Sequence, residues 1–377
     1  MATLPLARLG SMPVAQFMRR HWQRKPLLIR DAFPGFVTPV DADCLFRLAA
    51  RADVEARLVT AFDGWRLQHG PLARRRLPPL AKPRWTLLVQ GVDQHDDAAA
   101  DLLARFRFVS DARLDDLMVS YAADGGGVGP HIDDYDVFLL QARGQRRWRI
   151  GNGNARDLVP HLPLKILRRF EPEREWVLDP GDMLYLPPGI AHEGTAVGGG
   201  CITCSIGFRS PAWRELREPW LDMQCARRAP AGRYADPGTA PTRTPARLPR
   251  AFIDAAFDAF GRMPPTRADA RDVLLTFLTE PKASIVFARP QRAFGPQALR
   301  RLARRRGLRL DRRTRMLYSG GWIAINGELL DGTRPDASLM HDLADRRSLA
   351  PAQLAGLSAS AWRQFATWHA AGWLHTL

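Results

Sequence analysis

Gly125-Gly-Gly-Val-Gly-Pro-His-Ile-Asp133 is the stretch that decides the fold, because it delivers two candidate metal ligands from a loop onto a strand. The apolar run at 115–122 predicts a strand before it, and the glycine-rich loop cannot form a helix. On the strand that follows, residues two apart point to the same side. We therefore expect His131 and Asp133 to share a face.

A third candidate ligand, His192, lies 61 positions after His131. It follows Leu178-Asp-Pro-Gly-Asp-Met-Leu-Tyr-Leu-Pro-Pro-Gly189, which predicts a tight turn, a short strand and a second turn. Two imidazoles and one carboxylate hold non-haem Fe(II) on one face and leave positions open for other ligands. A lone histidine is usually an ordinary core or surface residue, but this order of strands, turns and ligands favours a metal site.

Short strands with glycine and proline turns predict a β-sandwich or barrel in the first half of the chain. A helix broken at Pro26 and a mixed, mostly helical stretch at 38–61 precede them. The expected strands are 27–30, 85–90, 115–122, 131–141, 145–150, 175–178, 183–186 and 201–208, with a helix at about 98–108.

Helical patterns dominate after residue 212. We expect helices at 213–227, 250–262 and 267–279, and a Pro- and Arg-rich linker at 229–249. The last part combines helices with a hairpin-like stretch at 315–330, which indicates a winged-helix-like module. The predicted domains are therefore 1–212, 213–265 and 266–377.

The composition is that of an ordinary soluble globular protein, with 46% hydrophobic and 25% charged residues among 377. No apolar run reaches 18 residues and no secretory signal is visible, so we expect no membrane association and a cytoplasmic location. Four cysteines are too few for a disulfide scaffold. Cys201 and Cys204 form one C-x-x-C on a predicted strand, where residues three apart face opposite sides, which argues against zinc.

The net charge of +16 has two interpretations. Arginine clusters at 74–76 and 299–306 favour a weak affinity for polyanions. The same excess is also expected if arginine replaces lysine throughout the chain because of coding bias. Charge alone leaves both interpretations open.

Strand alternation in Gly144-Gln-Arg-Arg-Trp-Arg-Ile150 places Arg146 on the side of Trp148 and Ile150. If that side faces the barrel interior, the buried Arg146 requires a carboxylate. The partner is either the far carboxylate of an α-keto acid bound at the metal or an internal aspartate. Ser120, on the preceding strand, is positioned to donate its hydroxyl to the same carboxylate.

Several motifs occur in the order typical of one protein family. The chain resembles the bacterial Jumonji-C oxygenases of the cupin type, specifically the ribosomal-protein arginine hydroxylases. The matching stretches are Phe17–Ile29, Gly125–Phe138, Arg146–Arg149, Asp179–Gly189 and His192–Gly194. The resemblance implies an α+β fold with an N-terminal double-stranded β-helix (the JmjC or cupin jelly-roll), a helical dimerisation region and a C-terminal winged-helix-like domain.

The resemblance also implies a chemistry. His131, Asp133 and His192 would hold Fe(II), and Arg146 with Ser120 would hold the cosubstrate 2-oxoglutarate. With O₂, the implied reaction hydroxylates one arginine Cβ in a large-subunit ribosomal protein, and the implied assembly is a homodimer.

A basic enzyme that acts on a basic protein needs local acids for recognition, and Asp124 and Asp134 are the first candidates. The alternative interpretation of Asp124 is a cap of the turn at the glycine loop. Two rival functions remain: a JmjC hydroxylase or demethylase of another protein, and a winged-helix nucleic-acid-binding regulator with a ligand-sensing cupin domain.

Overall fold

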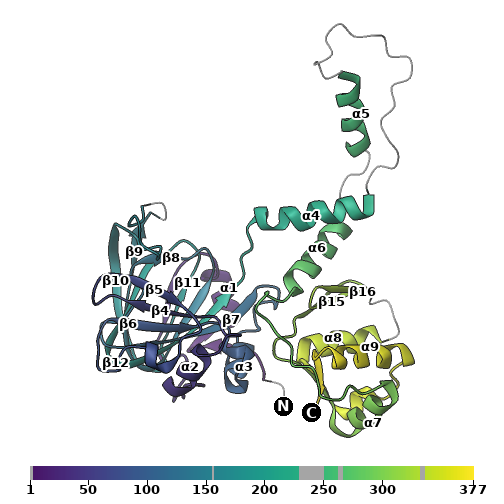
Figure 1. Cartoon of the computed structure of the whole chain (residues 1–377), viewed down its shortest axis with the longest axis horizontal. Helices are drawn as coiled ribbons and strands as arrows, with labels where there is room; N and C mark the ends of the chain where they lie inside the picture. Colours follow the sequence, from purple (N-terminus) through teal and green to yellow (C-terminus); the bar gives the residue numbers. More distant parts are fainter. Residues whose placement is uncertain (1–2, 155–156, 229–249, 262–265, 332–335) are drawn as a thin grey trace. The chain divides into compact units, whose positions relative to one another are not determined.

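The computed structural model describes residues 3–154, 157–228, 250–261, 266–331 and 336–377 (Figure 1). The chain divides into two compact units. The first comprises residues 1–210, 281–314 and 345–377, and the second comprises 211–280 and 315–344. Within the described ranges, no helix combines the length and the apolar character that crossing a membrane requires.

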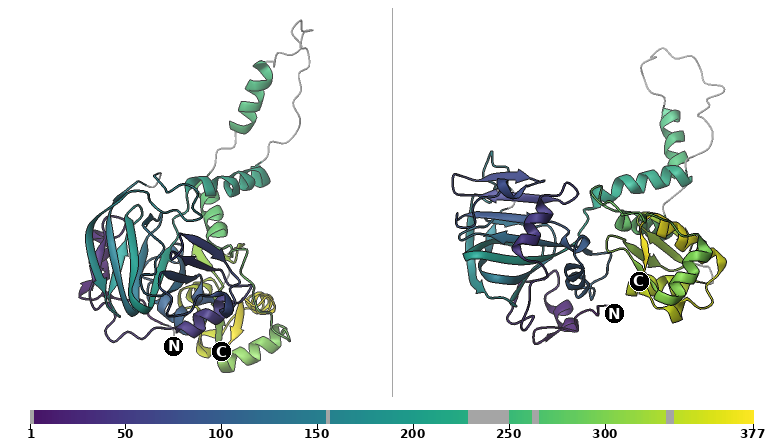
Figure 2. Two further views of the ribbon diagram at one scale, coloured as in Figure 1. Left: turned by 60° about the vertical axis from the view of Figure 1, so that its left-hand side comes forward. Right: turned by 60° about the horizontal axis from the view of Figure 1, so that its bottom comes forward.

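A ten-stranded antiparallel sheet curls into a barrel in the first unit, as Figures 1 and 2 show. Eight strands follow the order β3-β11-β9-β12-β7-β6-β4-β5, while β10 pairs with β9 and β8 pairs with β12. The strands are β3 (Leu27–Ile29), β4 (Ala56–Thr60), β5 (Arg66–His69), β6 (Trp85–Val89), β7 (Leu114–Ala122), β8 (His131–Ile132), β9 (Val137–Gly153), β10 (Phe170–Leu178), β11 (Met183–Leu186) and β12 (Ala191–Phe208). A small hairpin of β1 (Arg8–Leu9) and β2 (Met12–Pro13) precedes them.

Aromatic side chains cover one face of β9 and β11 in the main hydrophobic core. Phe17 from α1 (Val14–Arg20) packs on Phe138 and on the edge of Tyr185, and all three are buried. The fully buried carboxylate of Asp136 accepts a hydrogen bond of 2.6 Å from the Tyr185 hydroxyl and lies 3.1 Å from the Arg113 guanidinium. The buried charge is thus partnered, as a charge inside a protein must be.

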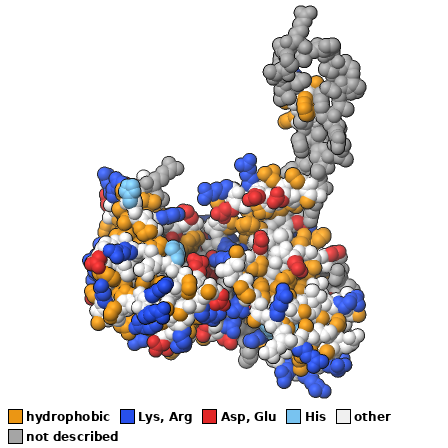
Figure 3. Space-filling model, viewed as in Figure 1, with side chains coloured by type: hydrophobic (Ala, Val, Ile, Leu, Met, Phe, Trp, Pro, Cys, Tyr) orange, Lys and Arg blue, Asp and Glu red, His pale blue; other side chains and the backbone are white. Residues whose placement is uncertain are grey.

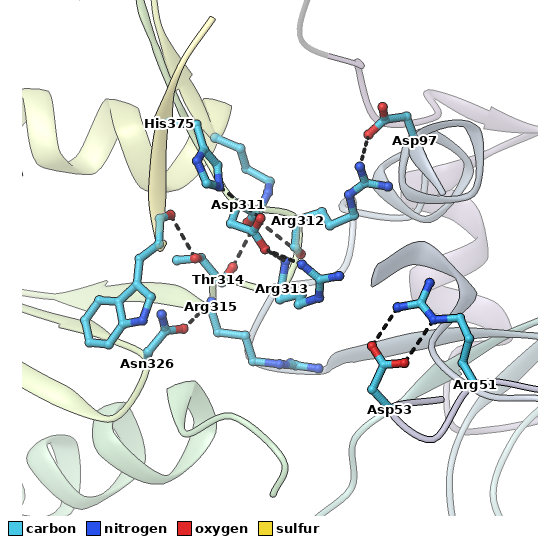
Figure 4. A network of polar contacts seen from close by, with 12 residues as sticks. Arg51, Asp53, Asp97, Asp311, Arg312, Arg313, Thr314, Arg315, Asn326 and His375 are labelled. Atoms are coloured by element: carbon cyan, nitrogen blue, oxygen red, sulfur yellow. Dashed lines mark hydrogen bonds and ion pairs between the residues drawn. The ribbon is translucent and has the colours of Figure 1, made fainter. Parts of the chain in front are cut away.

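Helices α2 (Ala42–Ala49) and α3 (Asp97–Ala104) both begin at an aspartate whose side chain accepts a backbone N–H. The C-terminal part of the same unit contains α7 (Pro296–Arg306), α9 (Ala359–Ala370) and a three-stranded sheet of β13 (Leu308–Leu310), β17 (Ser348–Leu349) and β18 (Leu374–Thr376). An ion pair of 2.9 Å joins Arg312 to Asp97 of α3 (Figure 4).

The second unit contains α4 (Trp213–Arg228), α5 (Arg250–Gly261), α6 (Arg267–Thr279), most of α8 (Ala337–Arg346) and the sheet of β14 (Met316–Ser319), β15 (Trp322–Ile325) and β16 (Glu328–Asp331). A reciprocal capping box between Thr266 and Asp269 begins α6. The guanidinium of Arg271 on α6 lies over the Trp322 ring of β15, which joins the helix to the sheet.

Several predicted boundaries were wrong. The mostly helical stretch at 38–61 contains β4, and the chain returns in β5, because the largely buried run Ala56–Thr60 pairs with β6. The expected strands at 131–141 and 145–150 are instead the short β8 and one long β9. The predicted hairpin at 315–330 is a three-stranded sheet. The predicted linker at 229–249 lies outside the described residues.

Candidate metal centre

His131, Asp133 and His192 lie together inside the barrel. One ligand atom from each lies within 4.8 Å of the others. The Asp133 Oδ2 is 3.8 Å from the His131 Nε2 and 3.7 Å from the His192 Nε2. Residues 131 and 192 are directly paired across β8 and β12, which explains how two histidines 61 positions apart in the sequence come to lie side by side. The structure therefore brings together all three predicted metal ligands.

Both imidazoles are fixed with Nε2 toward the shared site. The Nδ1 of His131 lies 2.9 Å from the Gly129 carbonyl oxygen, and the Nδ1 of His192 lies 2.9 Å from that of Ile190. A carbonyl oxygen only accepts, so each Nδ1 carries the proton and each Nε2 keeps a free lone pair. Burial, and then the neighbouring His131, lower the pKa of His192 to about 4. The neutral imidazole is the form that binds a metal.

Arg146 is a buried cation whose hydrogen bonds go to neutral groups. Its side chain points inward from β9 and the residue is 4% exposed. The guanidinium donates to the Gly194 carbonyl at 3.2 Å and to the Thr203 hydroxyl at 3.4 Å, and its Nε has no hydrogen-bond partner. Among the residues that the structure describes, no aspartate or glutamate lies within ion-pair distance of it. Burial lowers the pKa of Arg146, so an external carboxylate would be favoured here.

Thr203 and Gln141 belong to the same site, although the sequence analysis missed them. The Thr203 hydroxyl donates to the Gln141 side-chain oxygen at 3.0 Å and accepts from Arg146. Gln141 in turn donates to the carbonyl oxygens of Arg143 and Gly144, at 2.9 and 3.0 Å. This chain of hydrogen bonds orients the guanidinium. Strand alternation would have placed Thr203 on an inward face, but its partner depends on the pairing of β9 with β12.

Ser120, the second predicted cosubstrate contact, is buried and lies directly opposite Thr203 in the pairing of β7 with β12. Directly opposite residues have Cβ atoms about 5 Å apart on the same face of the sheet. Ser120 therefore lies on the side of the sheet that carries Thr203, the hydrogen-bond partner of the Arg146 guanidinium.

Trp148 and Gly194 shape the wall beside the metal ligands. The Trp148 ring lies 5.2 Å from the Arg146 guanidinium carbon and 6.0 Å from the His192 ring. A Cβ at position 194 would lie 2.7 Å from the Arg146 Nε and from the Trp148 ring, so only glycine fits there without displacement.

The two candidate substrate acids are exposed. The Asp124 carboxylate accepts the Gly198 N–H of β12 at 2.8 Å, a contact that connects the start of the glycine loop to that strand. Asp134 follows the ligand Asp133.

Comparison with known proteins gives the family. A family model described as the JmjC domain matches residues 101–216, and one described as a ROXA-like winged helix matches residues 262–375. The structure of YcfD, a ribosomal oxygenase from Escherichia coli, superposes with a TM-score of 0.84 at 30% identity, over 98% of this chain and 99% of that one. The chain belongs to the JmjC ribosomal oxygenases.

Ribosomal protein uL16 3-hydroxylase of Escherichia coli K12 is 40% identical to this JmjC ribosomal oxygenase over 232 residues. The aligned part spans 61% of each chain, which is less than two thirds of that relative's length. YcfD is also known in complex with cobalt and 2-oxoglutarate, and that structure superposes with a TM-score of 0.83 at 30% identity over the same shares of both chains.

These findings confirm the predicted family, the jelly-roll with a winged-helix module, and the use of Fe(II) and 2-oxoglutarate. The residues present fit both groups on their own chemistry. Two imidazoles and a carboxylate form the iron-binding set, and the buried, unneutralised Arg146 fits a dicarboxylate. The family is one of 2-oxoglutarate-dependent hydroxylases, in agreement with the predicted enzyme class.

Proposed function

We propose that this JmjC ribosomal oxygenase hydroxylates an arginine side chain, at Cβ, in a large-subunit ribosomal protein. The observation that carries the proposal is the placement of the His131–Asp133–His192 site and the carboxylate-free Arg146 in one barrel. The uL16 3-hydroxylase among the relatives supports the substrate class. Together with the hydroxylated arginine, the reaction yields succinate and CO₂ from 2-oxoglutarate and O₂.

The protein's residues would divide the work in a defined way. His131, Asp133 and His192 would hold Fe(II), which supplies activation of O₂ when bound. Arg146 would bind the far carboxylate of 2-oxoglutarate, helped by Ser120 and held in place by Thr203. The buried wall around Trp148 excludes water and keeps these charges in a low dielectric, where they act most strongly.

The direct test is turnover of an arginine-containing ribosomal-protein peptide with Fe(II) and 2-oxoglutarate. We expect a mass gain of one oxygen atom on arginine and an equal amount of succinate, both absent in His131→Ala. A demethylase would instead release formaldehyde from a methylated peptide. No succinate above the His131→Ala control would defeat the proposed activity.

Asp124 and Asp134 are the proposed contacts for the arginine guanidinium, because both are exposed acids next to the metal-binding segment. Asp124→Ala should raise the KM for the peptide while leaving uncoupled turnover of 2-oxoglutarate unchanged. Exposed Asp43, on α2, provides a matched aspartate control. An unchanged peptide KM in Asp124→Ala would exclude this role.

We further propose that the protein is a cytoplasmic homodimer that associates through the helices of region 213–265. Exposed apolar side chains on α4 and α5 support this assembly, since such residues rarely face water in clusters. They are Trp213 (87% exposed), Leu221, Ile253 and Phe257 (77%). Light scattering should show a dimer, and the double variant Ile253→Asp, Phe257→Asp should be monomeric.

A further inference from the structure

The positive charge of this chain is concentrated in one segment. Residues 281–310 contain nine arginine or lysine residues and no aspartate or glutamate. This stretch of 30 residues therefore contributes +9 to a net charge of +16. A solvated surface with no other role usually mixes both signs, so the one-sided composition calls for a partner of opposite charge.

Helix α7 (Pro296–Arg306) presents much of this charge on one side. Leu299 and Ala303 are fully buried and attach the helix to the fold. Four exposed arginines project from the opposite side, because a helix repeats every 3.6 residues. We call Arg300, Arg301, Arg304 and Arg305 the α7 arginine face. Figure 3 shows blue side chains gathered along the lower edge of the molecule, where Figure 1 labels α7.

Among the residues that the structure describes, the α7 arginine face forms no ion pair. In the described part of the chain, no carboxylate lies within 4.0 Å of any of its four guanidinium groups. Like charges three and four positions apart on a helix destabilise it. The arrangement thus costs stability unless an anion bridges the arginines.

The side chains of the α7 arginine face favour a chain of phosphate groups over other anionic ligands. An acidic protein partner would be expected to need an apolar centre, and this face offers none. A membrane-surface helix must insert apolar residues into the lipid, but those of α7 are buried in the protein. An arginine guanidinium, by contrast, can donate two parallel hydrogen bonds to the oxygens of one phosphate. Residues 300 and 305 are about 7.5 Å apart along the helix axis, about two nucleotide steps of one strand.

We propose that the α7 arginine face binds the phosphate backbone of RNA. The choice of RNA over DNA rests on the proposed function, since an enzyme that acts on a ribosomal protein works where RNA is present. Contacts to phosphate carry no sequence information, so we expect binding that does not depend on the RNA sequence. Because phosphate contacts release counterions, the affinity should fall strongly as the salt concentration rises.

The test measures binding of the full-length protein to a fluorescent RNA hairpin by anisotropy, at 50 and at 200 mM salt. Four phosphate contacts predict that this fourfold rise in salt weakens binding roughly 50- to 150-fold. The triple variant Arg301→Gln, Arg304→Gln, Arg305→Gln leaves one contact, so its affinity should fall only about threefold over the same range. It should also bind more weakly than the parent at 50 mM.

The matched control is Arg74→Gln, Arg75→Gln, Arg76→Gln, which removes the same charge from another exposed arginine run. It should keep the parent's salt dependence. Equal losses in the two triple variants would show that only net charge matters and would overturn the proposal. So would tighter binding to a DNA hairpin of the same sequence, or an equal α7-dependent affinity for anionic vesicles. The assay needs neither Fe(II) nor peptide, so its failure is distinct from failure of the proposed hydroxylase activity.

Discussion

Arg146→Met should make the cofactor-free protein more stable and remove its response to 2-oxoglutarate. The parent buries a cation that none of the described carboxylates neutralises and that is held by two long hydrogen bonds of 3.2 and 3.4 Å. Replacing buried charges by apolar side chains of similar volume has stabilised proteins by about 1–4 kcal/mol. The Gly194 carbonyl loses its side-chain donor, which offsets about 1 kcal/mol. We therefore expect a net gain of about 0–3 kcal/mol.

The same substitution removes the charged partner of the 2-oxoglutarate carboxylate. Loss of one member of a buried, hydrogen-bonded charge pair costs about 2–5 kcal/mol, which corresponds to roughly 30- to 5,000-fold in affinity. Urea unfolding with and without 2-oxoglutarate measures both effects, because a ligand that binds only the folded state raises its stability. The parent should be stabilised by 2-oxoglutarate in the presence of metal, and Arg146→Met should not.

Arg147→Met is the control, since Arg147 lies next along β9 but points outward. It forms a half-exposed ion pair with Glu175 at 3.2 Å, and such pairs contribute about 0–1 kcal/mol. It should leave 2-oxoglutarate binding unchanged. The reasoning is refuted if Arg146→Met lowers the free energy of unfolding by more than about 2 kcal/mol, or if its 2-oxoglutarate affinity stays within tenfold of the parent.

Three further changes probe the barrel and its surroundings. Gly194→Ala should lower the free energy of unfolding by about 1–3 kcal/mol and raise the 2-oxoglutarate KM, because the new Cβ would lie 2.7 Å from Arg146 and Trp148. The control Gly199→Ala places its Cβ in open space on the same strand and should change neither quantity. Asp136→Asn should cost about 2–4 kcal/mol in urea unfolding, because it leaves Arg113 without its charge partner, while turnover per folded molecule stays the same. Burial, and then Arg51 and Arg313, lower the pKa of His95 to about 4 from 6.5. The unfolded chain therefore binds more protons between these values, so stability falls as the pH drops from 6.5 toward 4, and His95→Gln should weaken that dependence. An identical pH profile in parent and His95→Gln would contradict this assignment.

Strand periodicity was enough to predict which side chains of the site face inward. Arg146, Trp148 and Ile150 are buried and Arg147 is exposed, as alternation required. Cys201 and Cys204 lie in different apolar clusters, in agreement with the argument against a zinc site. These predictions hold because they depend only on the geometry of a single strand.

Two features that depend on the exact register between strands escaped prediction. Gln141 and Thr203 meet only because β9 and β12 pair in a particular register, and nothing in either segment alone reveals that register. β4 was missed for a related reason. Its run Ala56–Thr60 follows a helix closely, and only its pairing with β5 and β6 distinguishes it from helix.

The register of β9 with β12 also fixes the relative positions of the metal ligands and Arg146. β12 carries His192, Gly194 and Thr203, and β9 carries Arg146 opposite Ala196. A slip of one residue would turn Arg146 outward and separate it from the metal ligands. The relation between the metal site and the carboxylate anchor is therefore fixed by the sheet. Asp124 and Asp134 lie outside its strands, so substitutions there should change the protein substrate while leaving cosubstrate use intact.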